Sequence, residues 1–138
     1  MRNRTKSREC ALQMLYQADI RHTAEAAPVM EAFWQAEAAA DPDVKTFANQ
    51  LVAGTLEHLA EIDALIGKYA DNWNMKRMAV IDRNILRLGV FELLHLEEVP
   101  PKVSINEAIE LAKRFGDAES GKFINGILDA IHKKTHAS

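Results

Sequence analysis

Apolar residues recur at the spacing of an α-helix along most of this chain, and no segment alternates convincingly with the period of two that a half-buried strand shows. Ala and Leu supply 34 of the 138 residues, which also favours helix. Six or seven helical segments follow from the pattern. The sequence therefore predicts an all-α protein, a single domain over 1–138 with two packed helical halves at roughly 1–73 and 74–138.

Several local signals predict where these helices begin and end. The segment 76–96 is apolar on almost every side, which is typical of a helix at the centre of a fold. The first helix is expected over about 8–22. Asp41 precedes a proline and is expected to be an N-cap. Ser104 and Glu107 have the spacing of a capping box, which predicts a helix start at Ser104.

The charges are unevenly distributed. Residues 1–22 carry five Lys and Arg against two Asp and Glu, whereas residues 23–66 carry one against eight. The whole chain has a formal net charge of −3. A basic segment on an otherwise acidic chain is typical of nucleic-acid contact at one edge, although a solvated terminus explains the same charges.

The composition argues against secreted and membrane proteins. Cys10 is the single cysteine, so an internal disulfide cannot form. The longest stretch without a charged residue, 46–56, is much shorter than the roughly 20 residues that a membrane-spanning helix needs. We therefore expect a cytoplasmic protein that makes no contact with a membrane.

The sequence offers little support for catalysis. Residues 116–122 fit the phosphate-loop pattern G-x-x-x-x-G-K, but Phe123 stands where that loop needs Ser or Thr. The pattern also follows a predicted helix rather than a strand, so a turn between two helices explains it better. The five histidines form no pair at metal-ligand spacing. We expect no metal, no cofactor and no enzymatic activity.

Cations and aromatic rings occur together near both ends of the chain. Lys6 and Arg8 precede Tyr16, while Lys122, Phe123 and Asn125 open the last helical segment. Single-stranded RNA is held by cations on its phosphates and by aromatic faces stacked on its bases. The spacing alone, however, favours a core position for both rings. It places Tyr16 on one apolar face with three other side chains, namely Leu12, Leu15 and Ile20.

Four strings resemble the NusB family of bacterial transcription antitermination factors. They are RECALQMLY over 8–16, DRNILRLG over 82–89, PKVSINEAIELAKRFG over 101–116 and KFINGILD over 122–129. The resemblance spans the whole length, with INEA and KFING as its most specific parts and 23–45 as its least.

This resemblance implies an all-helical protein that pairs with NusE, a small-subunit ribosomal protein. The pair would bind boxA, a short single-stranded RNA element, and assemble with other Nus factors and RNA polymerase. Such surfaces can also pair with themselves, which would give a homodimer. Carried over by position, the partner-binding residues would be Asp82, Arg83 and Arg87. The RNA-binding residues would be Lys6, Arg8, Tyr16, Glu119, Lys122, Phe123 and Asn125.

Two other classes of protein fit the same helical pattern. One is a helical scaffold that docks proteins and binds no RNA. The other is a NusB-like domain of a ribosomal RNA cytosine methyltransferase, which would need a further cofactor-binding domain. The salt dependence of RNA binding separates the first of these from an antitermination factor, because contacts to phosphates weaken as salt rises.

Overall fold

A computed structural model describes residues 2–37, 41–70 and 75–136, which contain helices and no strand. This result confirms the prediction of an all-α fold with six or seven helices. None of the described helices is both long and apolar enough to cross a membrane. The elements are α1 (Arg2–Ile20), α2 (Ala26–Ala36), α3 (Pro42–Glu57), α4 (Leu59–Tyr69), the 3-10 helix η1 (Met75–Arg77), α5 (Val80–His95), α6 (Pro101–Phe115) and α7 (Ser120–His136).

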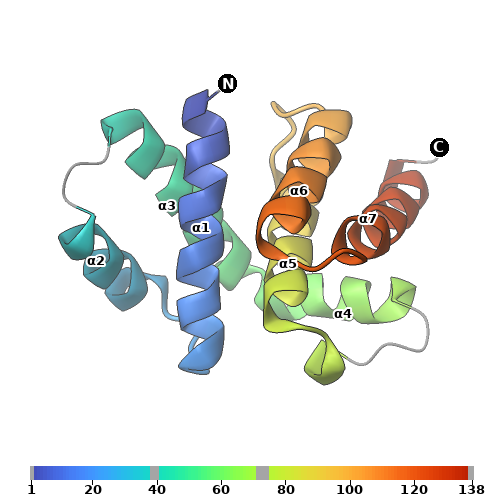
Figure 1. Ribbon diagram of the computed structural model, residues 1–138, viewed down its shortest axis with the longest axis horizontal. Helices are drawn as coiled ribbons and strands as arrows, with labels where there is room; N and C mark the ends of the chain where they lie inside the picture. Colours follow the sequence, from blue (N-terminus) through green and yellow to red (C-terminus); the bar gives the residue numbers. More distant parts are fainter. Residues whose placement is uncertain (1, 38–40, 71–74, 137–138) are drawn as a thin grey trace.

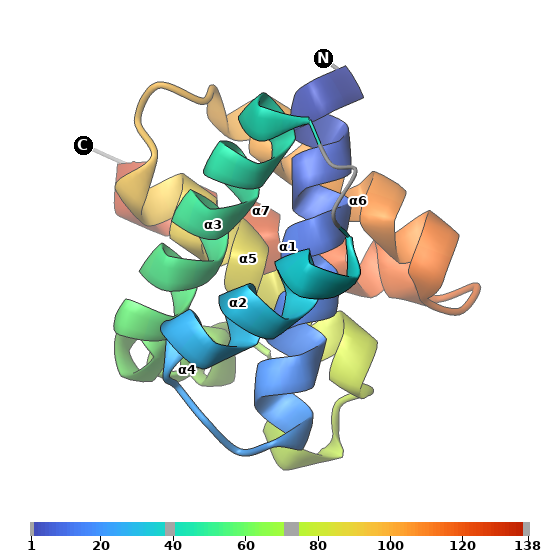
Figure 2. The same cartoon turned by 90° about the vertical axis from the view of Figure 1, so that its left-hand side faces the viewer.

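Helix α5 is the central helix, as its apolar sequence predicts. It contacts α1, α3 and α4 from the first part of the chain and α6 and α7 from the last part (Figure 1). A view from the side of α2 and α3 shows α5 behind them (Figure 2). Its side chains Ile85, Leu86 and Leu88 are almost completely buried. The expected boundary between the two halves lies at 71–74, outside the described residues, and stays a prediction.

Helix α1 begins at Arg2, earlier than the predicted start near Arg8. The extra turns are polar, but they are docked against the rest of the protein. The hydroxyl of Ser7 donates to the carbonyl oxygen of Val44 at 2.8 Å, and the hydroxyl of Thr5 donates to Glu107 at 2.7 Å. Contacts that are remote in sequence therefore extend the helix beyond its apolar segment.

One predicted helix start is confirmed and one is wrong. Asp41 caps α3, since its side chain accepts a hydrogen bond from the backbone N–H of Asp43 at 2.8 Å. Ser104 does not cap α6, which already begins at Pro101, where proline suits the first helical position. The buried Ser104 hydroxyl instead donates to Glu92 on α5 at 2.9 Å.

Gly54 on α3 allows an aromatic ring of α5 to lie directly on the α3 backbone. A Cβ atom at this position would come within 2.1 Å of the Phe91 ring, which is itself buried. Gly67 on α4, by contrast, has open space around the same position. The packing of α3 on α5 thus requires a residue without a side chain at Gly54.

Replacing Gly54 with alanine is expected to lower the free energy of unfolding by about 1–3 kcal/mol, because the new methyl group overpacks the core. Replacing Gly67 with alanine is expected to raise the free energy of unfolding slightly, because alanine is the better helix former. Urea unfolding followed by circular dichroism measures both effects. Equal stability of the two variants would contradict the close packing of Phe91 on α3.

Candidate nucleic-acid interface

Arg8 lies inside the protein, with 3% of its surface exposed. Its Nε and Nη2 atoms donate to the two carboxylate oxygens of Glu92 at 2.8 and 2.7 Å, and its Nη1 donates to Glu107 at 3.2 Å. Burial lowers the pKa of Arg8, but hydrogen bonds and the charges of both glutamates outweigh it and hold the pKa above its ordinary value. The expectation that Arg8 is a cation on the molecular surface is therefore wrong.

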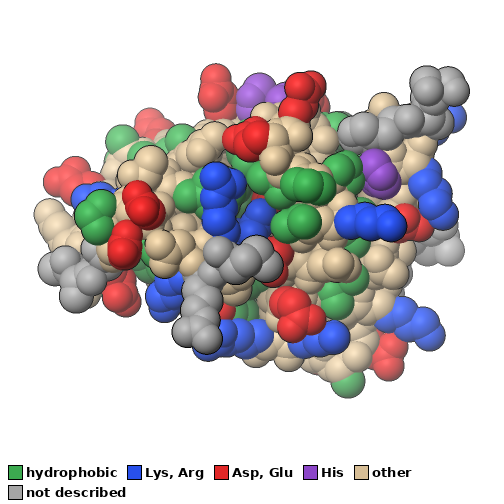
Figure 3. Space-filling model, turned by 90° about the horizontal axis from the view of Figure 1, so that it is seen from above, with side chains coloured by type: hydrophobic (Ala, Val, Ile, Leu, Met, Phe, Trp, Pro, Cys, Tyr) green, Lys and Arg blue, Asp and Glu red, His purple; other side chains and the backbone are tan. Residues whose placement is uncertain are grey.

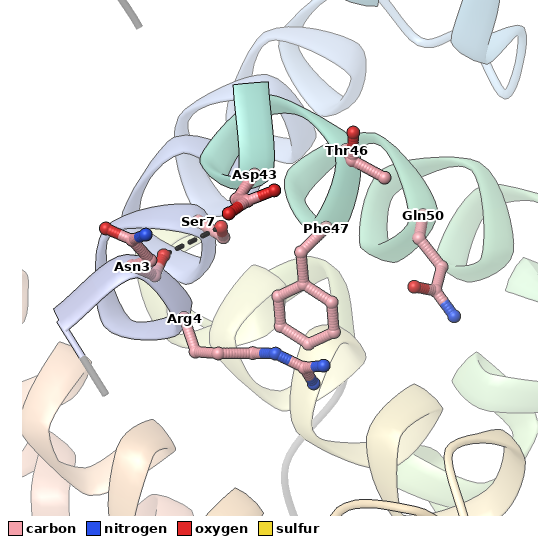
Figure 4. A pocket seen from close by; sticks show the side chains of 7 residues that line it. All are labelled: Asn3, Arg4, Ser7, Asp43, Thr46, Phe47 and Gln50. Atoms are coloured by element: carbon pink, nitrogen blue, oxygen red, sulfur yellow. Dashed lines mark hydrogen bonds between the residues drawn. The ribbon is translucent and has the colours of Figure 1, made fainter. Parts of the chain in front are cut away.

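The other two described cations near the start of α1 point in different directions. The Arg4 guanidinium lies over the Phe47 ring, 3.9 Å from its centroid, beside a cavity of about 360 Å³ between α1 and α3 (Figure 4). Lys6 is exposed, with its Nζ 4.0 Å from Glu9. On the face seen from above, basic side chains lie among acidic and hydrophobic ones (Figure 3). Of the predicted basic contacts in this segment, Lys6 is the one in solvent.

Tyr16 is on the surface, with 37% of its area exposed. The predicted apolar face of α1 is therefore only partly correct. Leu12 and Leu15 are buried, whereas Tyr16 and Ile20 lie on an exposed stripe of the helix with Gln13. This position makes the Tyr16 ring accessible to a ligand.

The second predicted ring, Phe123, lies near the start of α7. It is half-buried and packs against the core. The preceding turn is ordered by Asp117, whose side chain accepts a hydrogen bond from the backbone N–H of Glu119 at 2.9 Å. Glu119, Lys122 and Asn125 are exposed, and Glu119 lines the same cavity as the ring. The phosphate-loop pattern over 116–122 thus joins two helices, as expected.

The first turns of α5 connect the helices that carry the two rings. On α1, Asp19 lies one turn after Tyr16 and accepts hydrogen bonds from Arg83 at 2.8 and 2.9 Å. On α7, Phe123 lines a cavity of about 140 Å³ together with Asp82. Because Asp82 and Arg83 are consecutive, both rings belong to helices that dock on the same part of α5.

Asp82 is a buried carboxyl group with 9% of its surface exposed. Its Oδ1 atom has no hydrogen-bond partner within the described parts of the chain. Burial raises the pKa of Asp82, the hydroxyl of Ser120 opposes that rise, and the negative charge of Asp117 adds to it. The ionised form of Asp82 therefore lowers the free energy of unfolding.

Replacing Asp82 with asparagine is expected to stabilise the protein near neutral pH, because the change removes a buried charge. The raised pKa means that the folded state holds the proton more tightly than the unfolded state. The penalty therefore appears as pH rises through the folded-state pKa and disappears below the ordinary aspartate pKa of about 3.9. Urea unfolding should show the gain at neutral pH and little gain at about pH 3. A gain of equal size at both pH values would contradict this account.

The predicted partner-binding arginines make bonds within the protein. Arg87 donates to both oxygens of Asp63 on α4 at 2.8 and 2.9 Å, and to Asp19 at 3.0 Å. Burial raises the pKa of Asp19, but the hydrogen bonds from Arg83 and Asn84, together with the arginine charges, hold it below its ordinary value. These contacts tie α1, α4 and α5 together. Contact of Asp82, Arg83 and Arg87 with a partner stays a prediction.

Sequence reasoning missed two acidic residues that organise this region, Asp19 and Glu92. Asp19 accepts hydrogen bonds from three side chains of α5, and Glu92 fixes Arg8. Glu92 did carry a signal, since it is a charged residue among the apolar residues of a predicted buried helix. Asp19 carried none, because an acidic residue near a helix end is usually solvated.

The amino-acid sequence matches the NusB family over residues 5–133. It is 49% identical over 131 residues to the transcription antitermination protein NusB of Myxococcus xanthus, with 93% of each chain covered. It is 44% identical over 139 residues to the protein of the same name from Thermodesulfovibrio yellowstonii, with 95% of this chain and 92% of that one covered.

Solved structures show the same architecture. T. maritima NusB matches with a TM-score of 0.84 at 38% identity, covering 95% of this chain and 91% of that one. A structure of the antitermination factors NusB and NusE in complex with dsRNA matches with a TM-score of 0.87 at 32% identity. The latter match covers 97% of this chain and 98% of the other.

Proposed function

This chain belongs to the NusB family, and we propose that it acts as a transcription antitermination factor that binds RNA together with NusE. The observation that carries the proposal is that α1, which bears the exposed Tyr16 ring, and the start of α7 both contact the first turns of α5. Relatives named transcription antitermination protein NusB, and a similar structure that contains NusB, NusE and dsRNA, support the same function.

We propose that the RNA interface consists of the exposed stripe of α1 and the first turns of α7. The rings of Tyr16 and Phe123 would stack on bases, while the Lys122 ammonium would contact phosphates. Glu119 and Asn125 offer hydrogen-bonding groups for base edges or ribose hydroxyls. Lys6 would add a phosphate contact about 15 Å along α1 from Tyr16. Arg8 is not part of this interface, because its guanidinium donates its hydrogen bonds to Glu92 and Glu107 inside the protein.

Stacking on two side-chain rings requires unstacked bases, so we propose single-stranded boxA-type RNA as the ligand. NusE would dock beside the first turns of α5. Asp82 is buried there, and Arg83 and Arg87 bond within the protein, so these residues would support the docking surface from below. Other Nus factors and RNA polymerase would join this complex in the cytoplasm. A homodimer would compete with it if the same surface pairs with a second copy. No catalytic step is part of this function.

The experiment that tests this function is a titration of labelled single-stranded boxA-type RNA with the protein, with and without purified NusE, at two salt concentrations. Binding is expected to be tighter with NusE. The logarithm of the affinity should fall with the logarithm of the salt concentration by about 0.7 for each phosphate neutralised.

Two further RNA ligands test the specificity of binding. A duplex of the same sequence should bind more weakly than the single strand, because its bases are stacked. An unrelated single strand should retain the salt dependence and lose part of the affinity. NusE binding without any RNA binding would overturn the proposal and identify the chain as a protein-docking scaffold.

A further inference from the structure

We propose that His58, Glu61 and His95 form a binding site for one divalent transition-metal ion such as Zn²⁺. His58 lies between α3 and α4, Glu61 in the first turn of α4, and His95 at the end of α5. This proposal is independent of RNA binding, because Asp82 and His95 are at opposite ends of α5, about 20 Å apart along its axis.

The three side chains bring one potential ligand atom each to a single point on the surface. These ligand atoms all lie within 4.8 Å of one another. The Nε2 of His95 is 2.9 Å from Glu61 Oε1, and the Nδ1 of His58 is 3.8 Å from the same oxygen. A tetrahedral zinc ion with ordinary bond lengths holds its ligand atoms about 3.3 Å apart. The observed separations lie on both sides of that value. Because an imidazole nitrogen binds an ion in the plane of its ring, the two stacked rings must also rotate apart about their Cβ–Cγ bonds to share one ion.

The two imidazole rings lie against a buried aromatic ring. They stack on each other with centroids 4.0 Å apart and planes 17° apart. The Phe91 ring, which Gly54 allows to lie on α3, stacks against His95 at 5.6 Å and His58 at 6.3 Å. The side chains of both histidines are partly exposed. One side of the cluster is therefore a buried aromatic ring, and the other is open to an ion and its remaining water ligands.

The backbone at both histidines is also fixed. His58 ends α3 through a hydrogen bond from its N–H to the carbonyl of Gly54 at 3.1 Å, and its own carbonyl accepts from Ile62 at 2.9 Å. His95 is followed by Leu96, whose N–H closes the last turn of α5 on Glu92 at 3.1 Å. Two of the three ligands thus come from positions with little backbone freedom, which lowers the entropy lost on binding.

The chemistry of the three groups selects the class of ion. Two imidazole nitrogens and one carboxylate oxygen suit Zn²⁺, Ni²⁺, Co²⁺ or Cu²⁺, whereas Mg²⁺ and Ca²⁺ prefer oxygen ligands throughout. Bound at this point, the ion would link the α3–α4 corner to the end of α5. Because the unfolded chain does not hold these three groups together, binding would stabilise the folded protein.

Isothermal titration of the full chain, without a histidine tag, with Zn²⁺ and with Mg²⁺ tests the proposal. We expect one Zn²⁺ per chain, a rise in Tm with added Zn²⁺, and much weaker Mg²⁺ binding. His95→Gln and Glu61→Gln should each lower the Zn²⁺ affinity by more than about tenfold, since loss of a supporting contact alone costs that much. Both residues are on the surface, so both variants should fold.

His22→Asn is the matched control, since His22 lies outside the cluster and has a positive φ of 55° that asparagine tolerates. It should bind Zn²⁺ as the unaltered chain does. Absence of Zn²⁺ binding by the unaltered chain, or equal affinity in His95→Gln and His22→Asn, would overturn the proposal. The three side chains would then form only a hydrogen-bonded surface cluster.

Discussion

Replacing Arg8 with alanine is expected to lower the free energy of unfolding by about 3–5 kcal/mol, because one partner of a buried ion pair is lost. The Glu92 carboxylate is 2% exposed and would keep the hydroxyl of Ser104 as its remaining side-chain partner among the bonds that the structure describes. An unpaired charge at this depth is far less stable than the same charge in water. Thermal and urea unfolding followed by circular dichroism measure the loss.

Two other variants separate the charge effect from a general effect on α1. Lys6→Ala removes an exposed cation in the same turn of α1 as Arg8. It should change the free energy of unfolding by less than about 0.5 kcal/mol. Arg8→Met combined with Glu92→Met should recover much of the loss, because no charge is then buried alone. If Arg8→Ala and Lys6→Ala unfold alike, the Arg8–Glu92 pair does not hold α1 on α5.

The helices could be predicted from sequence because each one buries a continuous apolar face. Their ends were harder to predict, because contacts between remote segments decide them. Ser104 has the right spacing to cap a helix, but its hydroxyl bonds to Glu92 on another helix. The polar turns before Arg8 lack an apolar pattern, but hydrogen bonds from Ser7 to α3 and from Thr5 to α6 stabilise them.

Arg8 was predicted to be an exposed RNA-binding residue, but its side chain is buried. A basic residue among other basic residues near a terminus is usually solvated. Its main partner, Glu92, is 84 positions away, and no local pattern connects the two. A charged residue inside a predicted buried helix was the available signal, since such a group needs a partner of opposite charge.

The two rings illustrate the limit of helical spacing. Tyr16 follows directly after the buried Leu15, so a small rotation of α1 decides whether the ring is inside or outside. That rotation is set by the packing of α1 on α3 and α5, which the pattern of one helix does not contain. The resemblance to the NusB family supplied the exposed position, and the structure agrees for Tyr16 and leaves Phe123 half-buried.

Replacing Tyr16 or Phe123 with alanine is expected to weaken single-stranded RNA binding by about 5- to 150-fold each, since a stacked base contributes about 1–3 kcal/mol. The variant that lacks both rings should lose more than either alone. Phe33→Ala is the matched control for Phe123→Ala, because Phe33 is also a half-buried ring packed against the core. It lies on α2, on the other side of α1 from α7 (Figure 1), and should leave RNA affinity unchanged.

The affinity of the Tyr16→Ala, Phe123→Ala double variant for boxA-type RNA in the presence of NusE is the most direct test of the proposed interface. Fluorescence anisotropy gives the affinity, and circular dichroism gives the fraction of folded protein to which it is normalised. We expect the folded double variant to bind this RNA at least about 25-fold more weakly than the unaltered chain does. An affinity per folded molecule equal to that of the unaltered chain would contradict this expectation and exclude both rings from the RNA interface.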